Sequence, residues 1–256
     1  MLNPGSWWKP WWALIAAPVL VAASFTVAAA SPAAAAITLG NGAEGGSSGT
    51  TVTAVNSGGG SGNAFDVVNV GTGATAIFDS TQAAHGGLSY AFATGSTASL
   101  ARVKWTTSMG PQTQVWFRAY LYFTADPAAT VRVVDQDQGT TACSVVVVLP
   151  SGKLQVRTGS TGTQTLTTTN TIPLNQWFRI EGYVIGSATA GQVELKLFKT
   201  ADSTTPDETE TSAPNINTYG TTDTYNFGIS TATANVAEYW EDDIAISNAG
   251  YIGPGS

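Results

Sequence analysis

Short segments of alternating apolar and polar residues follow one another between residues 75 and 246, with turn-forming residues between them. Side chains of an extended strand point alternately to the two faces of a sheet, so this period of two predicts strands with one buried face. No segment between these strands repeats its apolar residues with the helical period of 3.6, so long amphipathic helices are not expected. The pattern predicts one all-β domain, an antiparallel jelly-roll sandwich of two sheets.

The expected strands are these: Thr75–Phe78, Leu88–Phe92, Leu100–Trp105, Val115–Phe123, Val131–Val134, Cys143–Leu149, Leu154–Val156, Trp177–Ile185, Val193–Phe198, Tyr225–Ile229 and Tyr239–Ile246.

Two of these strands share an unusual composition, since each alternates an apolar face with a face that carries Trp, Arg and Tyr together. Aromatic rings can stack on the apolar faces of sugars while charged groups bind the hydroxyls, which makes this composition typical of a glycan platform. A second interpretation stays open: Arg–Glu pairs and ring edges cover a sheet that loops partly bury. The candidate ligand-binding residues, called the aromatic face below, are Trp116, Arg118, Tyr120, Tyr122, Arg179, Glu181 and Tyr183.

The chain divides into three parts by composition. Residues 1–36 are an apolar segment, in which Trp11–Ala30 carries no charge and has the length of a membrane span. Small residues at Ala34–Ala36 fit cleavage of a signal peptide before Ile37, while an uncleaved anchor or a virion-assembly arm are the alternatives. Residues 37–63 read as a Gly/Ser-rich linker with a first strand at Thr51–Val55, and residues 64–256 as the sandwich.

Charge and cysteine content narrow the classes of function. Ten basic against 17 acidic residues give a net charge of −7, which disfavours nucleic acid as a partner. The single cysteine, Cys143, cannot form an intramolecular disulfide, and its Val-rich surroundings predict a buried thiol on a strand.

Three segments together resemble the laminin-G-like, concanavalin A-like lectin/glucanase superfamily: Val115–Phe123, Asn175–Glu181 and Trp240–Ile246. The end of the sequence, Gly250–Pro254, also resembles uncharacterised actinobacterial and actinobacteriophage proteins of this fold. The resemblance implies a jelly roll whose concave side or rim loops bind glycans.

Catalytic and metal motifs are weak. Some glucanases of this superfamily carry an E-x-D-x-x-E strand, but here Glu241 and Asp243 are followed by Ile246 at the third position, so a hydrolase is not expected. His85 is interpreted as a turn residue. Calcium at Asp135–Gly139 or at Asp242 and Asp243 is an alternative to solvated charge, although on a regular strand those last two would point to opposite faces.

These observations predict a non-catalytic carbohydrate-binding module, extracellular or on the cell surface, with a polysaccharide or glycan surface as partner and no cofactor. The alternative is a phage virion structural protein, either a surface decoration or a minor tail component. In both cases residues 1–36 would provide the contact with a membrane or with other virion subunits.

Overall fold

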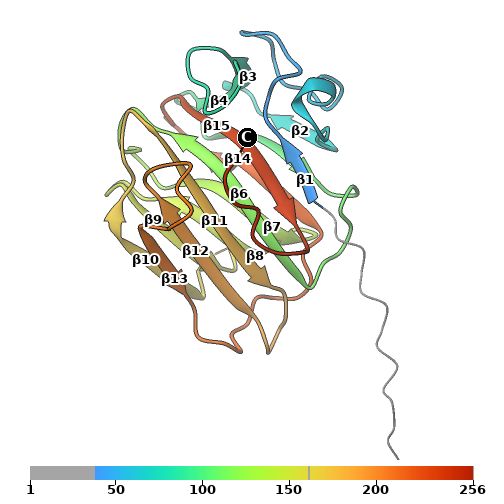
Figure 1. The fold of residues 1–256 in the computed structure, drawn as a ribbon, viewed down its shortest axis with the longest axis vertical. Helices are drawn as coiled ribbons and strands as arrows, with labels where there is room; N and C mark the ends of the chain where they lie inside the picture. Colours follow the sequence, from blue (N-terminus) through green and yellow to red (C-terminus); the bar gives the residue numbers. More distant parts are fainter. Residues whose placement is uncertain (1–37, 161, 256) are drawn as a thin grey trace, which may run out of the picture. The chain divides into compact units, whose positions relative to one another are not determined.

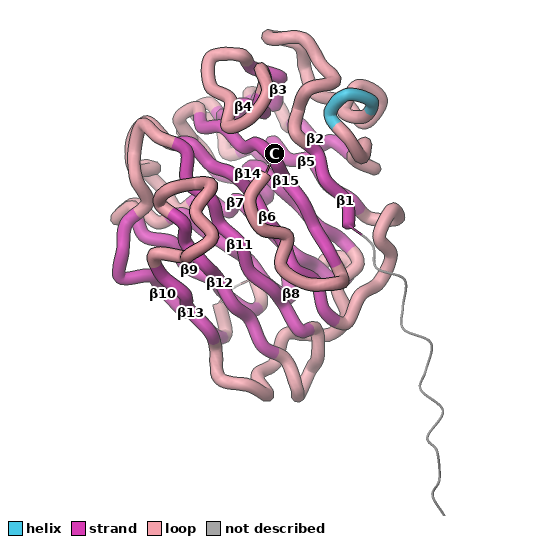
Figure 2. Tube along the Cα trace, viewed as in Figure 1, coloured by secondary structure: helices cyan, strands magenta, loops and turns pink. Residues whose placement is uncertain are grey.

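The computed structural model describes residues 38–160 and 162–255, which form a two-layered antiparallel β-sandwich. The jelly-roll prediction is therefore confirmed. The strands of both layers run across the molecule in Figures 1 and 2, with short loops at either end. The expected signal peptide, anchor or arm lies outside the described residues, within which no helix is long and apolar enough to cross a membrane.

Sheet A contains the two strands of the aromatic face. Its order is β13 (Glu208–Thr211), β12 (Gln192–Phe198), β11 (Trp177–Ile185), β6 (Gln114–Tyr122), β15 (Tyr239–Ser247), β4 (Ser89–Thr94) and β3 (Ala74–Asp79), and β1 (Thr38–Asn41) also pairs with β15.

Sheet B forms the second layer. Its order is β10 (Gln164–Thr171), β9 (Lys153–Thr158), β8 (Thr141–Val148), β7 (Val131–Gln138), β14 (Thr224–Thr233), β5 (Ser99–Trp105) and β2 (Val67–Val70).

The core lies between the sheets and is filled by alternate residues of each strand. On β6 these are Val115, Phe117, Ala119 and Leu121, all at most 1% exposed. On β14, Tyr225 and Phe227 face them from the other layer. Burial of this apolar area is the main stabilising contribution to the fold. Cys143 lies in the same core as a free thiol, as predicted, and burial raises its pKa to about 12.

A carboxyl group also lies inside the core and joins the two layers. Glu241 of β15 is fully buried, and its Oε1 accepts hydrogen bonds from the amide of Gly228 on β14 (3.0 Å) and from the hydroxyl of Tyr239 (3.1 Å). Burial raises the pKa of Glu241 to about 8, so it holds its proton at neutral pH. A Cβ at Gly228 would lie 2.6 Å from the carbonyl oxygen of Ala101, which makes glycine necessary there.

The first part of the domain differs from the prediction. The first described strand is β1 (Thr38–Asn41) rather than Thr51–Val55, where only Thr51 forms an isolated bridge, to Ile77. The Gly/Ser-rich residues that follow form defined turns and the short 3₁₀ helix η1 (Gly59–Ser61). Side-chain hydrogen bonds add to the core contacts of Ala43 and Val52 here: the side-chain amide of Asn41 donates to the carbonyl of Ser57, 2.7 Å away. Such bonds are invisible to a hydropathy pattern.

Three further strands escaped the sequence prediction, namely β2, β10 and β13. The last two are polar, since β10 is mostly Thr and β13 reads Glu-Thr-Glu-Thr. Both lie at sheet edges, where only one neighbour is needed and apolar alternation is weak. The acidic segment Glu208–Thr211, for which the sequence analysis predicts no strand, is therefore an edge strand.

Candidate functional site

The residues of the aromatic face lie together on the outer side of sheet A. In the antiparallel pairing of β6 with β11, Arg118 lies opposite Glu181, and Trp116 lies opposite Tyr183. Tyr122 lies between two tryptophan rings, with centroids 5.5 Å from Trp177 and 5.6 Å from Trp240.

The middle of the aromatic face is covered from outside. Tyr120, Arg179 and Glu181 are at most 2% exposed and Arg118 is 9% exposed, although all four point away from the core between the sheets. The residues at its ends, Trp116, Tyr122, Tyr183, are half-buried.

Main-chain carbonyl groups of β15 and of the covering segments accept hydrogen bonds from both arginines. Arg118 donates from Nε to the carbonyl of Asp243 (2.9 Å) and from Nη1 to that of Gly253 (3.0 Å). Arg179 donates to the carbonyls of Ala201 and Ser203 and forms an ion pair with Glu181 at 2.9 Å. This geometry matches the second interpretation, in which charged pairs cover a sheet that loops partly bury.

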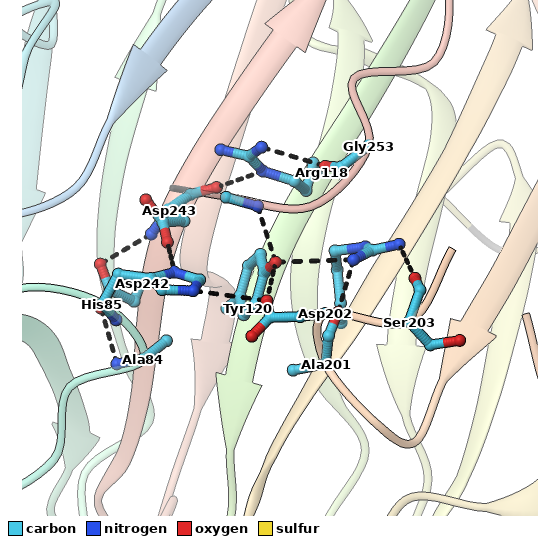
Figure 3. A network of polar contacts seen from close by, with 12 residues as sticks. Ala84, His85, Arg118, Tyr120, Ala201, Asp202, Ser203, Asp242, Asp243 and Gly253 are labelled. Carbon is cyan, nitrogen blue, oxygen red and sulfur yellow. Dashed lines mark hydrogen bonds and ion pairs between the residues drawn. The ribbon is translucent and has the colours of Figure 1, made fainter. Parts of the chain in front are cut away.

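A histidine joins this covering layer to the sheet (Figure 3). The ring of His85, in the loop before β4, contacts Asp243 through Nδ1 and lies 3.3 Å from Asp202 through Nε2. The Tyr120 hydroxyl donates to the same Asp202 carboxylate at 2.7 Å. Burial lowers the pKa of His85, but the two carboxylates outweigh it and raise the pKa above its usual value. The predicted turn histidine is thus a link between three segments.

Asp242 and Asp243 would point to opposite faces on a regular strand, but β15 is not regular at this point. β15 has an irregular register between Asp242 and Ala245, and Asp243 adopts a φ of 44°. Because of this bulge both carboxylates reach the same loop: Asp242 accepts from the amides of Ala84 and His85, and Asp243 contacts the His85 ring. Glu241, which points into the core, cannot act with them, so the E-x-D arrangement of the glucanases is absent at this strand.

A cleft on the outer face of sheet B is the second polar site, and the sequence reasoning missed it. Its volume is about 240 Å³, and strands β5, β7 and β14 form its floor. Cross-strand pairing aligns Lys104, Asn226 and Asp135 in one row, because Asn226 pairs with Lys104 on one side and with Asp135 on the other. The remaining lining includes Arg102, Arg132, Asp137, Thr224 and Ser230.

Two neighbouring carboxyl groups dominate the electrostatics of the cleft. Burial raises the pKa of Asp135 well above its usual value, and the nearby Asp137 raises it further. The pKa of Asp137 is also raised, chiefly by burial. Two carboxylates this close cannot both ionise readily, so the pair retains a proton at higher pH than an exposed aspartate. Arg132 lies 3.2 Å from Asp135 and partly offsets its charge.

Two buried acceptor atoms at the cleft lack hydrogen-bond partners. Within residues 38–160 and 162–255, Oδ1 of Asp135 and Oδ1 of Asn226 are buried and have no hydrogen-bond partner. Asn226 Nδ2 donates to Asp137 at 2.9 Å, and one Arg102 nitrogen donates to the Ser230 carbonyl at 3.2 Å. Unsatisfied buried acceptors are costly, and a ligand that donates hydrogen bonds removes that cost.

One sequence signal could have identified this cleft. The segment Asp135–Gly139 was considered a calcium loop or solvated charge, but β7 continues through Gln138 and buries Asp135 and Asp137. A β-bulge between Arg132 and Val134 shifts the alternation, which hid the continuation of the strand. The described part of the chain contains no group of three or more His, Cys, Asp and Glu side chains placed to hold a metal ion.

No protein-family model matches the chain, and no curated protein sequence matches it either. Solved structures do match. An endo-β-1,4-glucuronan lyase from the fungus Trichoderma reesei has 11% sequence identity and a TM-score of 0.54, over 72% of this chain and 91% of the lyase. The cellulose-induced protein Cip1 has 17% identity and a TM-score of 0.52, over 73% and 94%.

A protein of unknown function from Shewanella oneidensis MR-1 has 16% identity and a TM-score of 0.54, over 85% of this chain and 89% of its own. At these identities the likeness concerns the fold. The chain is therefore a jelly-roll β-sandwich with a covered polar face on sheet A and an open polar cleft on sheet B.

Proposed function

We propose that this chain is a secreted or surface-displayed, non-catalytic carbohydrate-binding module that holds an acidic glycan in the cleft of sheet B. The observation that carries the proposal is the composition of the cleft: three cationic side chains, Arg102, Lys104 and Arg132, surround buried acceptor atoms that lack partners in the described structure. Sugars offer many hydroxyl donors, and uronic acids add a carboxylate, so one ligand class satisfies both sets of groups.

The cleft suits this role better than the aromatic face does. Protein carbonyl groups and carboxylates already occupy the arginine donors of the aromatic face. In the cleft, Arg102 and Arg132 also donate to the carbonyls of Ser230 and Ser160, but the half-buried Lys104 makes no hydrogen bond or ion pair with the described residues. The glucuronan named for one structural neighbour is a polymer of the same acidic class. That name supports the choice of ligands to test.

A second candidate, β-elimination of the same acidic polymer, rests on the proton shared by Asp135 and Asp137. In such a step, a cation of the cleft would neutralise the uronate carboxylate and the ionised aspartate would remove the proton from C5. As the C4=C5 double bond forms, the C4–O4 bond breaks and the protonated aspartate returns a proton to O4. The two carboxyls would have to lie on one side of the sugar ring.

One titration separates these functions. Isothermal titration calorimetry with glucuronan, alginate and neutral cellulose oligosaccharides should show saturable binding to the acidic chains only, and Arg102→Ala should weaken it by about tenfold. Lys153→Ala, on β9, is the matched control. The ultraviolet absorbance of the same mixtures should stay constant. A rise in absorbance from unsaturated sugar ends would instead support the second candidate function, lyase activity. Absence of binding to every acidic chain would contradict the proposal.

The virion alternative makes the same prediction for the cleft and a different one for the N-terminus. A decoration or tail protein would bind the glycan of a host surface, so acidic glycan binding is compatible with either setting. Mass spectrometry of the N-terminus of the exported protein distinguishes them: a start at Ile37 would support secretion, and an intact Met1 would support an anchor or an assembly arm.

A further inference from the structure

The segment that follows β15 lies on the outside of sheet A, across β15 and β6 (Figure 1). Residues 250–255, here named the clasp, read Gly-Tyr-Ile-Gly-Pro-Gly and belong to no strand. The clasp touches the sheet mainly through its main chain and through one ring. This division resembles the way in which domains bind extended peptides, where main-chain hydrogen bonds provide affinity and one side chain enters a pocket.

The main-chain contacts of the clasp are made by the buried polar residues of the aromatic face. Arg118 donates to the Gly253 carbonyl at 3.0 Å, and the Gly253 amide donates to the Glu181 carboxylate, so both polar groups of one residue are recognised. The Gly255 amide donates to the Tyr120 hydroxyl at 2.7 Å. The side chains of the sheet therefore offer donors and acceptors that match the amide and carbonyl groups of a peptide backbone.

Glycine is needed for this close approach. A Cβ at residue 255 would lie 2.4 Å from Oδ2 of Asp243 and 2.9 Å from the His85 ring, distances that no side chain tolerates without movement. Gly253 has a φ of 78°, in the region that favours glycine. The fit selects a particular peptide shape, with small residues two positions apart.

The side-chain anchor is Tyr251. Its ring centroid is 6.4 Å from that of Trp116 and 6.3 Å from that of Tyr183, both at steep angles, and the Lys196 ammonium lies 3.4 Å from its centre. The Tyr251 hydroxyl also contacts Glu194. These groups form an open aromatic and cationic box in which Tyr251 remains 42% exposed, so the ring can leave without disturbing the core.

We propose that the aromatic face is a binding site for peptides with a Tyr-x-Gly spacing, and that the clasp is its occupant within the same chain. A partner that presents such a segment replaces the clasp, whose departure breaks no strand. The clasp competes at the high effective concentration of a tethered ligand, which is of the order of millimolar for a short connection. Ligands that bind more weakly than the tethered clasp therefore do not displace it, and only tightly binding peptides reach the site. This inference is independent of the glycan cleft.

The test uses the full chain and a fluorescent peptide with the sequence of residues 249–255. Tyr251→Ala removes the anchor of the clasp but leaves the face intact, so this variant should bind the peptide at least about fivefold more tightly than the unaltered chain does. Addition of Trp116→Ala to the variant should weaken binding about tenfold, and a control peptide with Ala in place of Tyr should bind no better than background. Near-ultraviolet circular dichroism verifies the fold of each variant.

Two results would overturn the proposal. One is the absence of saturable binding to the Tyr251→Ala chain at peptide concentrations up to about 1 mM, with native circular dichroism. The other is a fluorescence signal that Trp116→Ala leaves unchanged, which would place the peptide elsewhere. Gly255→Ala serves as a second clasp-loosening variant, and it should also increase peptide binding. Displacement of bound peptide by acidic oligosaccharides would instead assign this face to glycans.

Discussion

The outer faces of the two sheets carry similar charged residues, but loops cover those of sheet A and leave those of sheet B open to solvent. On sheet A, Arg118 and Arg179 are buried under loops, and their donors end on main-chain carbonyls and on Glu181. On sheet B, Arg102 and Lys104 line an open cleft beside one carboxyl oxygen of Asp135 and the amide oxygen of Asn226, which have no partner among the described residues. A charged residue on a strand thus indicates a polar outer face, while the neighbouring loops decide whether that face is structural or available to a ligand.

The largest effect should follow from removal of one arginine on sheet A. Arg179→Met leaves the buried Glu181 without its ion-pair partner and the carbonyls of Ala201 and Ser203 without their donor, so the free energy of unfolding should fall by about 3 to 5 kcal/mol. Arg132→Met in the sheet B cleft is the matched change and should cost about 1 kcal/mol or less, because Asp135 can take up a proton instead.

Urea denaturation of both variants at pH 7 measures this difference. Equal losses on the two faces would contradict the comparison, because they would mean that the cleft arginine is as firmly integrated as the covered one. A loss in Arg179→Met that Glu181→Met reverses would identify the unpaired carboxylate as the source of the cost.

A smaller effect, of opposite sign, is expected at the carboxyl pair in the cleft. The folded-state pKa values of Asp135 and Asp137 are raised, so the native state holds a proton that the unfolded chain releases. Stability therefore falls as the pH rises from the unfolded value near 3.8 through the raised folded values. Asp135→Asn removes this cost and should stabilise the protein at pH 7.5 by about 1 to 2 kcal/mol, with a difference that shrinks toward pH 4.

Thermal melts of Asp135→Asn and the unaltered chain between pH 4 and 8 test this prediction. Asp66→Asn is a suitable contrast: hydrogen bonds from Ser108 and from the amides of Thr106 and Thr107 lower the pKa of Asp66 to about 2, despite an opposing effect of burial. It should destabilise the protein at neutral pH and lose its effect only as the pH falls toward 2. A destabilised Asp135→Asn at pH 7.5 would show that the pair is ionised and needed.

The sequence predicted the layers of the fold well because most strands alternate strictly, as Val115 to Phe123 does. It failed where alternation breaks. The bulges at Arg132–Val134 and Asp242–Ala245 shift the facing of the residues after them, and a one-residue shift moves every later side chain to the other face. The edge strands β10 and β13 failed for a different reason, since they are largely polar.

The candidate sites divide in the same way. Pairing of the two Trp/Arg/Tyr strands follows from their patterns, so the aromatic face could be assembled from sequence. Its covering could not, because contacts such as Arg118 with Gly253 join residues far apart in the chain through main-chain atoms that carry no sequence signature. The cleft on sheet B depends on three strands meeting in register, which no single segment encodes.

The smallest expected effect concerns the histidine that links the covering layer. His85 gains carboxylate partners on folding, and its pKa is raised although burial opposes this, so its stabilising contribution is complete below about pH 6.5 and is lost as the pH rises through the folded value. With a side chain 25% exposed, it should contribute less than about 1 kcal/mol.

In His85→Gln the difference from the unaltered chain should be largest at pH values below about 6.5 and should disappear as the pH rises through the raised folded pKa of His85. The pH range in which His85 affects stability begins at a higher pH than the range of the Asp135 and Asp137 pair. The melting temperature of the double variant His85→Gln/Asp135→Asn, measured against pH, therefore reports the two faces separately. Additive melting curves are expected, since the sites lie on different sheets. A His85→Gln curve parallel to that of the unaltered chain at every pH would mean that the ring stays neutral between Asp202 and Asp243 and that packing alone holds the loop on sheet A.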